Sequence, residues 1–199
     1  RRGAEVQPGY APVWLHFGEV LQSQERHLEA VGMFNQFIER SKEFYYDTST
    51  QYDAAANAVE YRYTPRTDVD SVHLLCAALF KRAVSYIRLK EETMALHDLW
   101  LIVDTAYSHR WTSRAYLALA QLAKLRGDWH QARNLATKGI DSAGQEQTRD
   151  EACARLLSQA HHLRAVCYEA LEDESRAEQD HVLADFYFRE SAFKGNSSR

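Results

Sequence analysis

The sequence predicts an all-α protein built from helical hairpins that repeat along the chain. Only three prolines and eight glycines occur in 199 residues, which disfavours a β-sandwich with its many tight turns. Small and aromatic residues also recur, in one order, at the spacing of a single helix face. We therefore expect pairs of amphipathic helices joined by short turns.

The clearest hairpin starts at Tyr116. Its first helix places residues on one face at spacing i, i+3, i+4 and i+7, namely Tyr116, Leu119, Ala120 and Ala123. Gly127 ends that helix, because glycine readily adopts the left-handed backbone conformation. Small residues of the second helix let the two axes approach closely: Ala132, Ala136 and Gly139. The segment thus predicts helix, tight turn and helix.

The same spacing recurs elsewhere in the chain. It occurs as Trp14, Phe17, Gly18, Leu21 and Ala30, and again as Phe80, Ala83, Tyr86 and Ala95. A looser form consists of Ala165, Tyr168 and Ala177. We therefore place hairpins near residues 11–44, 76–109, 113–146 and 158–191.

This pattern resembles the tetratricopeptide repeat, a helical hairpin of about 34 residues. The resemblance implies a right-handed superhelical solenoid whose concave surface, lined by the first helix of each hairpin, binds a protein partner. The matching outward positions here are Leu15, His16, Glu19, Phe80, Lys81, Val84, Arg88, Arg114, Leu117, Gln121, Lys124, His162, Val166 and Glu169. Four cations would make the middle of this groove basic and favour a partner with an acidic segment: Lys81, Arg88, Arg114 and Lys124.

An insertion near residues 45–75 separates the first two hairpins. Residues 52–61 contain an alanine-rich run that we interpret as a short helix, which ends before Pro65. The insertion is either an ordered surface loop or a degenerate helical pair. We favour the loop, because Pro65 falls where the second helix of a repeat should continue. Its flanking aromatic residues either pack it onto the helices or form an exposed patch for a partner.

The C-terminal part departs from a regular repeat. Thr148 and Glu151 form a capping-box pattern that predicts a helix over 149–171. A last helix over 175–192 would then close the stack as a cap. We expect residues 1–192 to form a single helical domain, followed by a polar tail over 193–199.

Charge and cysteine content restrict the partner and the compartment. The net charge of −4 offers no basic surface for nucleic acid or for an anionic membrane, and no apolar run is long enough for a transmembrane helix. Three cysteines without CxxC spacing argue against disulfides and zinc. We expect buried thiols in a reducing, cytoplasmic or nuclear compartment. No signal peptide is visible, and the start at Arg1 suggests a piece of a longer protein.

Catalytic and cofactor-binding patterns are missing from the sequence, which contains no HExxH, GxSxG, GxxxxGK[S/T] or GxGxxG. His161 and His162 are adjacent, so on a helix they point about 100° apart and cannot easily share a metal. We interpret His97 and Asp98 as part of a solvated helix face. We therefore expect no enzymatic activity, no metal and no cofactor.

These observations favour a non-enzymatic module that binds a peptide or a helix of a protein partner. One alternative is an RNA-binding helical repeat of the pentatricopeptide type, although such arrays are strictly spaced and this chain is irregular and acidic. Another alternative is a regulatory domain appended to an enzyme.

Overall fold

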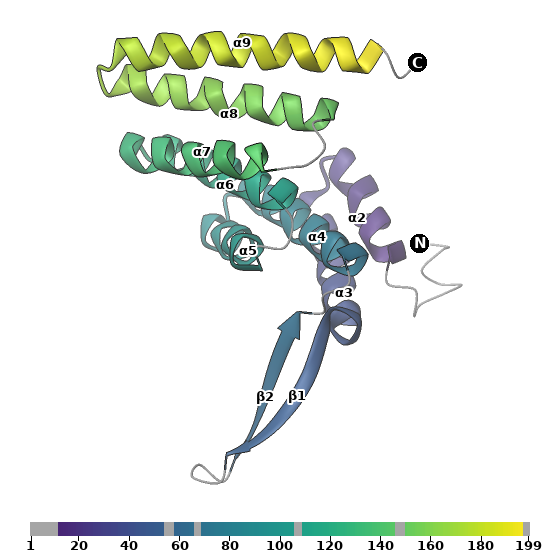
Figure 1. The fold of residues 1–199 in the computed structure, drawn as a ribbon. Helices are drawn as coiled ribbons and strands as arrows, with labels where there is room; N and C mark the ends of the chain where they lie inside the picture. Colours follow the sequence, from purple (N-terminus) through teal and green to yellow (C-terminus); the bar gives the residue numbers. More distant parts are fainter. Residues whose placement is uncertain (1–11, 54–57, 66–68, 106–108, 146–149, 197–199) are drawn as a thin grey trace. The chain divides into compact units, whose positions relative to one another are not determined.

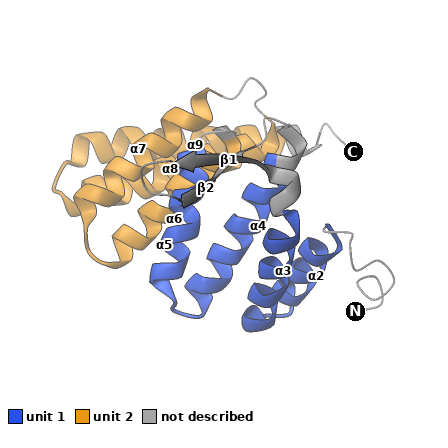
Figure 2. Ribbon diagram, turned by 90° about the horizontal axis from the view of Figure 1, so that it is seen from below, with its two compact units in different colours: residues 1–107 blue, residues 108–199 orange. Residues whose placement is uncertain are grey.

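The computed structural model describes residues 12–53, 58–65, 69–105, 109–145 and 150–196. Within these ranges the chain forms eight helices and one pair of strands. The chain divides into two compact units, residues 1–107 (unit 1) and residues 108–199 (unit 2), which Figure 2 colours separately.

Unit 1 holds two helical hairpins. The first consists of α2 (Pro12–Ser23) and α3 (His27–Tyr45), and the second of α4 (Val69–Arg88) and α5 (Glu92–Thr105). Each helix packs against the next one along the chain, so that α3 also contacts α4 (Figure 1). Stacked hairpins of this kind bury one continuous core between neighbours.

One close contact in this core joins α2 to α3. Phe34 of α3 is completely buried. Its ring lies against Gly18 of α2, where an added Cβ atom would come within 2.5 Å of Cε1 of Phe34. Glycine is needed at this position because the ring fills the space that a side chain would occupy.

The insertion forms a β-hairpin. β1 (Tyr46–Asp53) pairs antiparallel with β2 (Ala58–Pro65), as Figure 1 shows. Tyr46 lies opposite Pro65. The predicted short helix over 52–61 was wrong at residues 52–53 and 58–61, which belong to paired strands where a surface loop was favoured, and residues 54–57 lie outside the described residues. The tyrosine, threonine and valine residues of these strands favour extended backbone. Pro65 ends β2, where a missing N–H is tolerated.

Unit 2 repeats the arrangement of two hairpins. The first consists of α6 (His109–Leu125) and α7 (Trp129–Gly144), and the second of α8 (Glu151–Ala170) and α9 (Glu174–Asn196). Each helix again packs against the next, and α6 also contacts α8. α9 continues to Asn196, so it includes residues 193–196 that were predicted to belong to the polar tail.

Aspartates begin three of these helices, and Asp173 caps α9 by accepting a hydrogen bond from the N–H of Arg176 at 3.2 Å. Asp128 accepts a hydrogen bond from the N–H of Gln131 at 3.0 Å, and Asp150 accepts one from the N–H of Cys153 at 2.8 Å. The predicted capping box was therefore wrong about the cap of α8, which is Asp150. Its expected partner Thr148 lies outside the described residues.

All hairpin turns end their first helix in the same way. One residue of each turn has a positive φ between 60° and 78°: Glu25, Lys90, Gly127 and Glu172. The next N–H then bonds back to a carbonyl of the last helical turn, as from Asp128 to Ala123 at 3.0 Å. The turn predicted at Gly127 is confirmed. The turn geometry that the hairpins share indicates that they are repeats of one motif.

The fold is therefore the predicted all-helical hairpin repeat, with a β-hairpin in the insertion. Cys76, Cys153 and Cys167 are free and buried, as predicted. None of the helices within the described ranges is both long and apolar enough to cross a membrane. A single domain over 1–192 stays a prediction, because the chain divides into two compact units.

Candidate functional site

Two of the predicted groove residues are core residues. Leu15 in unit 1 and Leu117 in unit 2 were predicted to face outward, but both are buried. In each unit the first helix packs against the third as well as the second, as α2 does against α4 and α6 against α8. Leucine gains about 2 kcal/mol from such burial, which explains why the outward prediction was wrong.

Glu19 and Lys81 neutralise each other on unit 1. Nζ of Lys81 lies 3.2 Å from Oε1 of Glu19, and Nδ1 of His16 lies 3.1 Å from Oε2. Burial raises the pKa of Glu19, but the hydrogen bonds with His16 and Lys81 outweigh it and hold that pKa below its ordinary value. Glu19 is therefore ionised at neutral pH. Lys81 does not supply the unpaired positive charge that the sequence predicted for the groove.

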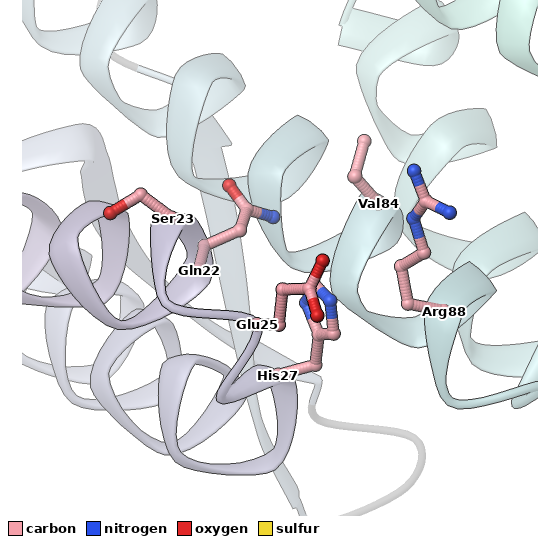
Figure 3. A pocket seen from close by; sticks show the side chains of 6 residues that line it. All are labelled: Gln22, Ser23, Glu25, His27, Val84 and Arg88. Carbon is pink, nitrogen blue, oxygen red and sulfur yellow. The ribbon is translucent and has the colours of Figure 1, made fainter.

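Unit 1 contains an open cleft of about 520 Å³ between the α2–α3 turn and the C-terminal part of α4. Figure 3 shows its lining side chains, which are Gln22, Ser23, Glu25, His27, Val84 and Arg88. Val84 and Arg88 were predicted groove residues, and the cleft brings them together with residues of the turn that the sequence did not single out. Phe80, also predicted, is half-buried on the same helix.

Gln22 holds one wall of this cleft in place. Its side-chain amide donates hydrogen bonds to the carbonyl of Lys81 at 2.9 Å and to Oγ of Ser85 at 3.0 Å. Ser85 is completely buried, so this contact fixes the end of α2 against α4. The cleft is thereby preformed by helix packing rather than by a loop, which favours precise placement of a ligand.

Arg88 supplies the cleft with a charged group that is open to a ligand. Arg88 is exposed and forms no ion pair with any other described residue. Nδ1 of His27 is buried and has no hydrogen-bond partner within the described part of the chain. In Figure 3 the side chains of Glu25 and His27 extend from the α2–α3 turn toward the side of the cleft where α4 carries Arg88.

Several predicted groove residues of unit 2 already have partners there. Arg114 lies over Trp111, with its guanidinium carbon 4.9 Å from the ring centroid. Nε2 of His181 lies 2.8 Å from Oε1 of Glu169, and the rings of His162 and His181 are 5.7 Å apart. The other predicted residues of this unit are exposed or half-buried: Gln121, Lys124 and Val166.

An arginine–aspartate ion pair, which we call the staple, joins the two helices of the second hairpin of unit 1. Nε and Nη2 of Arg82 donate to the two carboxylate oxygens of Asp98, at 2.8 and 2.6 Å. Nη1 of Arg82 also donates to Oδ1 of Asn35 in α3, at 2.7 Å. The arginine thus joins its own hairpin to the hairpin before it. Asp98 was predicted to lie on a solvated helix face, which was wrong because it is almost completely buried.

The second hairpin of unit 2 carries the same staple. Nε and Nη2 of Arg164 donate to the carboxylate of Asp180, both at 2.7 Å, and Nη1 donates to Thr137 of α7 at 3.2 Å. Nδ1 of His161 lies 2.8 Å from Oδ1 of the same aspartate. In both units the arginine precedes the aspartate by 16 residues. That shared spacing was the signal in the sequence that could have found the staples.

The staple makes the stability of unit 2 sensitive to acid. Burial raises the pKa of Asp180, but hydrogen bonds from Arg164 and His161 outweigh it, so the pKa lies below the ordinary 3.8. The stability from the ionised carboxylate is complete above that ordinary value and is lost as the pH falls through the lower pKa of the folded chain. We expect the difference in unfolding free energy between wild type and Asp180→Asn to shrink between about pH 5 and pH 1 in urea titrations. A difference that stays constant over that range would contradict the assignment.

No group of three or more histidine, cysteine, aspartate or glutamate side chains is placed to hold a metal ion in the parts of the chain that the structure describes. The side chains gathered in the cleft are suited to hydrogen bonding and charge pairing with a bound segment. The cleft of unit 1 is therefore the candidate functional site.

Comparisons with known proteins bear on the fold. The chain is similar to two solved structures, "Crystal structure of MamA" and "Crystal structure of MamA protein", with TM-scores of 0.62 and 0.58 and 13% identity to each. The matches cover 96% and 95% of this chain and 85% and 79% of those chains. No family model and no curated protein matches the chain. The likeness to MamA, a tetratricopeptide-like helical repeat protein, shows that this chain has the same type of fold.

Proposed function

We propose that the chain is a non-enzymatic protein-binding module, and that the cleft of unit 1 binds an extended peptide segment with an acidic side chain. The observation that carries this proposal is the preformed cleft, whose volume of about 520 Å³ lies within the range of ligand pockets. Its walls come from packed helices, so little ordering is needed before a peptide binds. The three buried, free cysteines suit a reducing compartment, and we propose an intracellular location.

The chemistry of the cleft favours a carboxylate near Arg88. A guanidinium group can donate two parallel hydrogen bonds to one carboxylate. α3 begins at His27, and the start of a helix carries partial positive charge that also attracts an anion. Glu25 lines the turn side of the cleft, so the acidic group is expected to bind closer to α4. Val84 adds an apolar contact beside it.

Reversing the charge of Arg88 is expected to weaken peptide binding by about tenfold or more, because the carboxylate would then meet a like charge. The probes are peptides selected on the wild-type chain from a displayed random library, with affinities measured by fluorescence anisotropy. The matched control is Lys90→Glu, which makes the same charge change in an exposed residue that does not line the cleft.

The two variants distinguish a contact between the peptide and Arg88 in the cleft from general electrostatic attraction of the peptide to the protein surface. We expect selected peptides to be enriched in aspartate or glutamate, and to lose affinity for Arg88→Glu while retaining it for Lys90→Glu. Equal loss in both variants would point to general attraction rather than to the cleft. A library that yields no binding peptide would contradict the proposed function itself.

A further inference from the structure

Unit 2 repeats the two-hairpin arrangement of unit 1 residue by residue. α4 and α8, the first helices of the second hairpins, each contain 20 residues, and each staple reaches back to the hairpin before it. The staples and the turns identify matching residues: Asn35 with Thr137, Arg82 with Arg164, Asp98 with Asp180, and Lys90 with Glu172. A position in one unit therefore has a defined counterpart in the other.

The β-hairpin accounts for the difference in spacing between the two units. Before β1, matching residues are separated in the sequence by one constant interval, as from Asn35 to Thr137. After β2 the interval is shorter and again constant, as from Arg82 to Arg164. The two intervals differ by the length of the β-hairpin, residues 46–65. Without this segment the helices of the two units coincide in register, so the counterparts of the cleft residues can be read from the sequence.

The six residues that line the cleft of unit 1 have counterparts in unit 2, which we call the unit 2 site. In the order of the cleft residues they are Lys124, Leu125, Gly127, Trp129, Val166 and Ala170. One contact supports this assignment, because Gln22 bonds to Ser85 in unit 1 and Cys167 is the counterpart of Ser85. Burial raises the pKa of Cys167, and the positive charge of Lys124 opposes that rise. Lys124 therefore lies near Cys167, as Gln22 lies near its serine.

The unit 2 site is apolar at positions where the cleft of unit 1 is polar. Leu125 stands where unit 1 has a serine, and it is 79% exposed. Trp129 stands where unit 1 has a histidine and is half-buried, and Val166 keeps the valine of the cleft. Ala170 takes the place of the exposed arginine. An exposed leucine beside a half-buried tryptophan offers contact area to a large apolar side chain of a partner.

Two half-buried cations accompany these apolar residues. Lys124 and Arg133 form no ion pair with another described residue. Both charges act on the thiol of the same buried cysteine, so the two cations lie near each other. Two acidic residues adjacent to the site in the sequence are engaged elsewhere, because Asp128 caps α7 and Glu169 pairs with His181. A carboxylate from a partner would therefore meet positive charge that the described part of the chain leaves unpaired.

We propose that the unit 2 site binds a second class of peptide segment, which carries a large apolar side chain next to an aspartate or a glutamate. The apolar side chain packs against Leu125, Trp129 and Val166, and the carboxylate pairs with Lys124. This inference rests on the proposed function in that the ligand is again a peptide. The cleft of unit 1 has Val84 as its apolar lining residue, so the two sites select different sequences.

Peptides selected on the Arg88→Glu variant of the 199-residue chain test the proposal, because this variant lacks the cation of the unit 1 cleft. The probes come from a displayed random library, and their affinities are measured by fluorescence anisotropy. We expect them to carry a large apolar residue next to an acidic one. Adding Leu125→Asp should lower their affinity by about tenfold or more, because a charge then meets the apolar side chain. The matched control adds Leu28→Asp, the same change in a leucine that is 74% exposed and does not line the cleft.

A charge reversal tests the carboxylate contact. Lys124→Glu should weaken the selected peptides by about tenfold or more, and should weaken less the same peptides with their acidic residue changed to its amide. If Arg88→Glu binds no peptide while wild type binds acidic ones, the unit 2 site is overturned and the proposed function stands. Binding that Leu125→Asp and Leu28→Asp weaken equally also overturns the site. Peptides whose binding depends on Leu125 support it even if no peptide binds the cleft of unit 1.

Discussion

Replacing Asp180 by alanine is expected to lower the free energy of unfolding by about 3–5 kcal/mol, because it removes one partner of a buried ion pair. Asp180 is 2% exposed and accepts hydrogen bonds from Arg164 at 2.7 Å and from His161 at 2.8 Å. Without the carboxylate, the guanidinium of Arg164 stays in a half-buried site, where Thr137 is its remaining hydrogen-bond partner among the described residues. Urea denaturation followed by circular dichroism measures the loss.

An exposed ion pair of unit 2 provides the control for Asp180→Ala. Arg155 pairs with Glu151 on the surface of α8, so Arg155→Ala should change stability by at most about 1 kcal/mol. Replacing both staple residues, by Arg164→Met and Asp180→Leu, should recover most of the loss, because no unpaired charge remains. If Asp180→Ala costs no more than Arg155→Ala, the staple does not hold the hairpin.

The second large effect is expected in unit 1, where Phe34→Ala should cost about 3–5 kcal/mol of unfolding free energy. Phe34 is fully buried and its ring fills the space beside Gly18, so truncation leaves a cavity between α2 and α3. Helices cannot easily close this gap, because the hairpin turn and the contact of α3 with α4 hold them in place. Urea denaturation again provides the measurement.

The matched control is Phe188→Ala, which removes the same side chain from an exposed position and should change stability by about 0.5 kcal/mol or less. Gly18→Ala probes the same contact from the opposite side and should be destabilising, because its Cβ collides with the Phe34 ring. Combining Gly18→Ala with Phe34→Leu should cost less than the two changes added together. Strict additivity would show that the two positions are not in contact.

The helical hairpins could be predicted from the sequence because their signal is periodic and local. Gly18 and Ala120 occupy the same position in two hairpins, and each is followed at the same distance by an alanine, Ala30 or Ala132. The Gly127 turn follows from backbone sterics. The strand pair was missed because an alanine run has high helix propensity, whereas strand pairing depends on a segment elsewhere in the chain. Local propensity gave the wrong answer where a non-local contact decided the structure.

The site was only partly predictable for a related reason. Val84 and Arg88 follow from helix periodicity, but Gln22, Glu25 and His27 reach the cleft through a turn whose direction the sequence does not reveal. Leu15 and Leu117 have the spacing of groove residues, yet contacts between first and third helices bury them. The pairing of Lys81 with Glu19 likewise depends on how α2 lies against α4.

The staples have a consequence for misfolding. Repeats with similar apolar patterns can stack in a shifted register at little cost, because small and aromatic residues fit several neighbours almost equally well. A hairpin shifted by one helical turn would bury Asp98 or Asp180 without its arginine, which costs several kcal/mol. Each unit thus carries a buried carboxylate, Asp98 or Asp180, that would lack its arginine in an incorrect stacking and would penalise that arrangement.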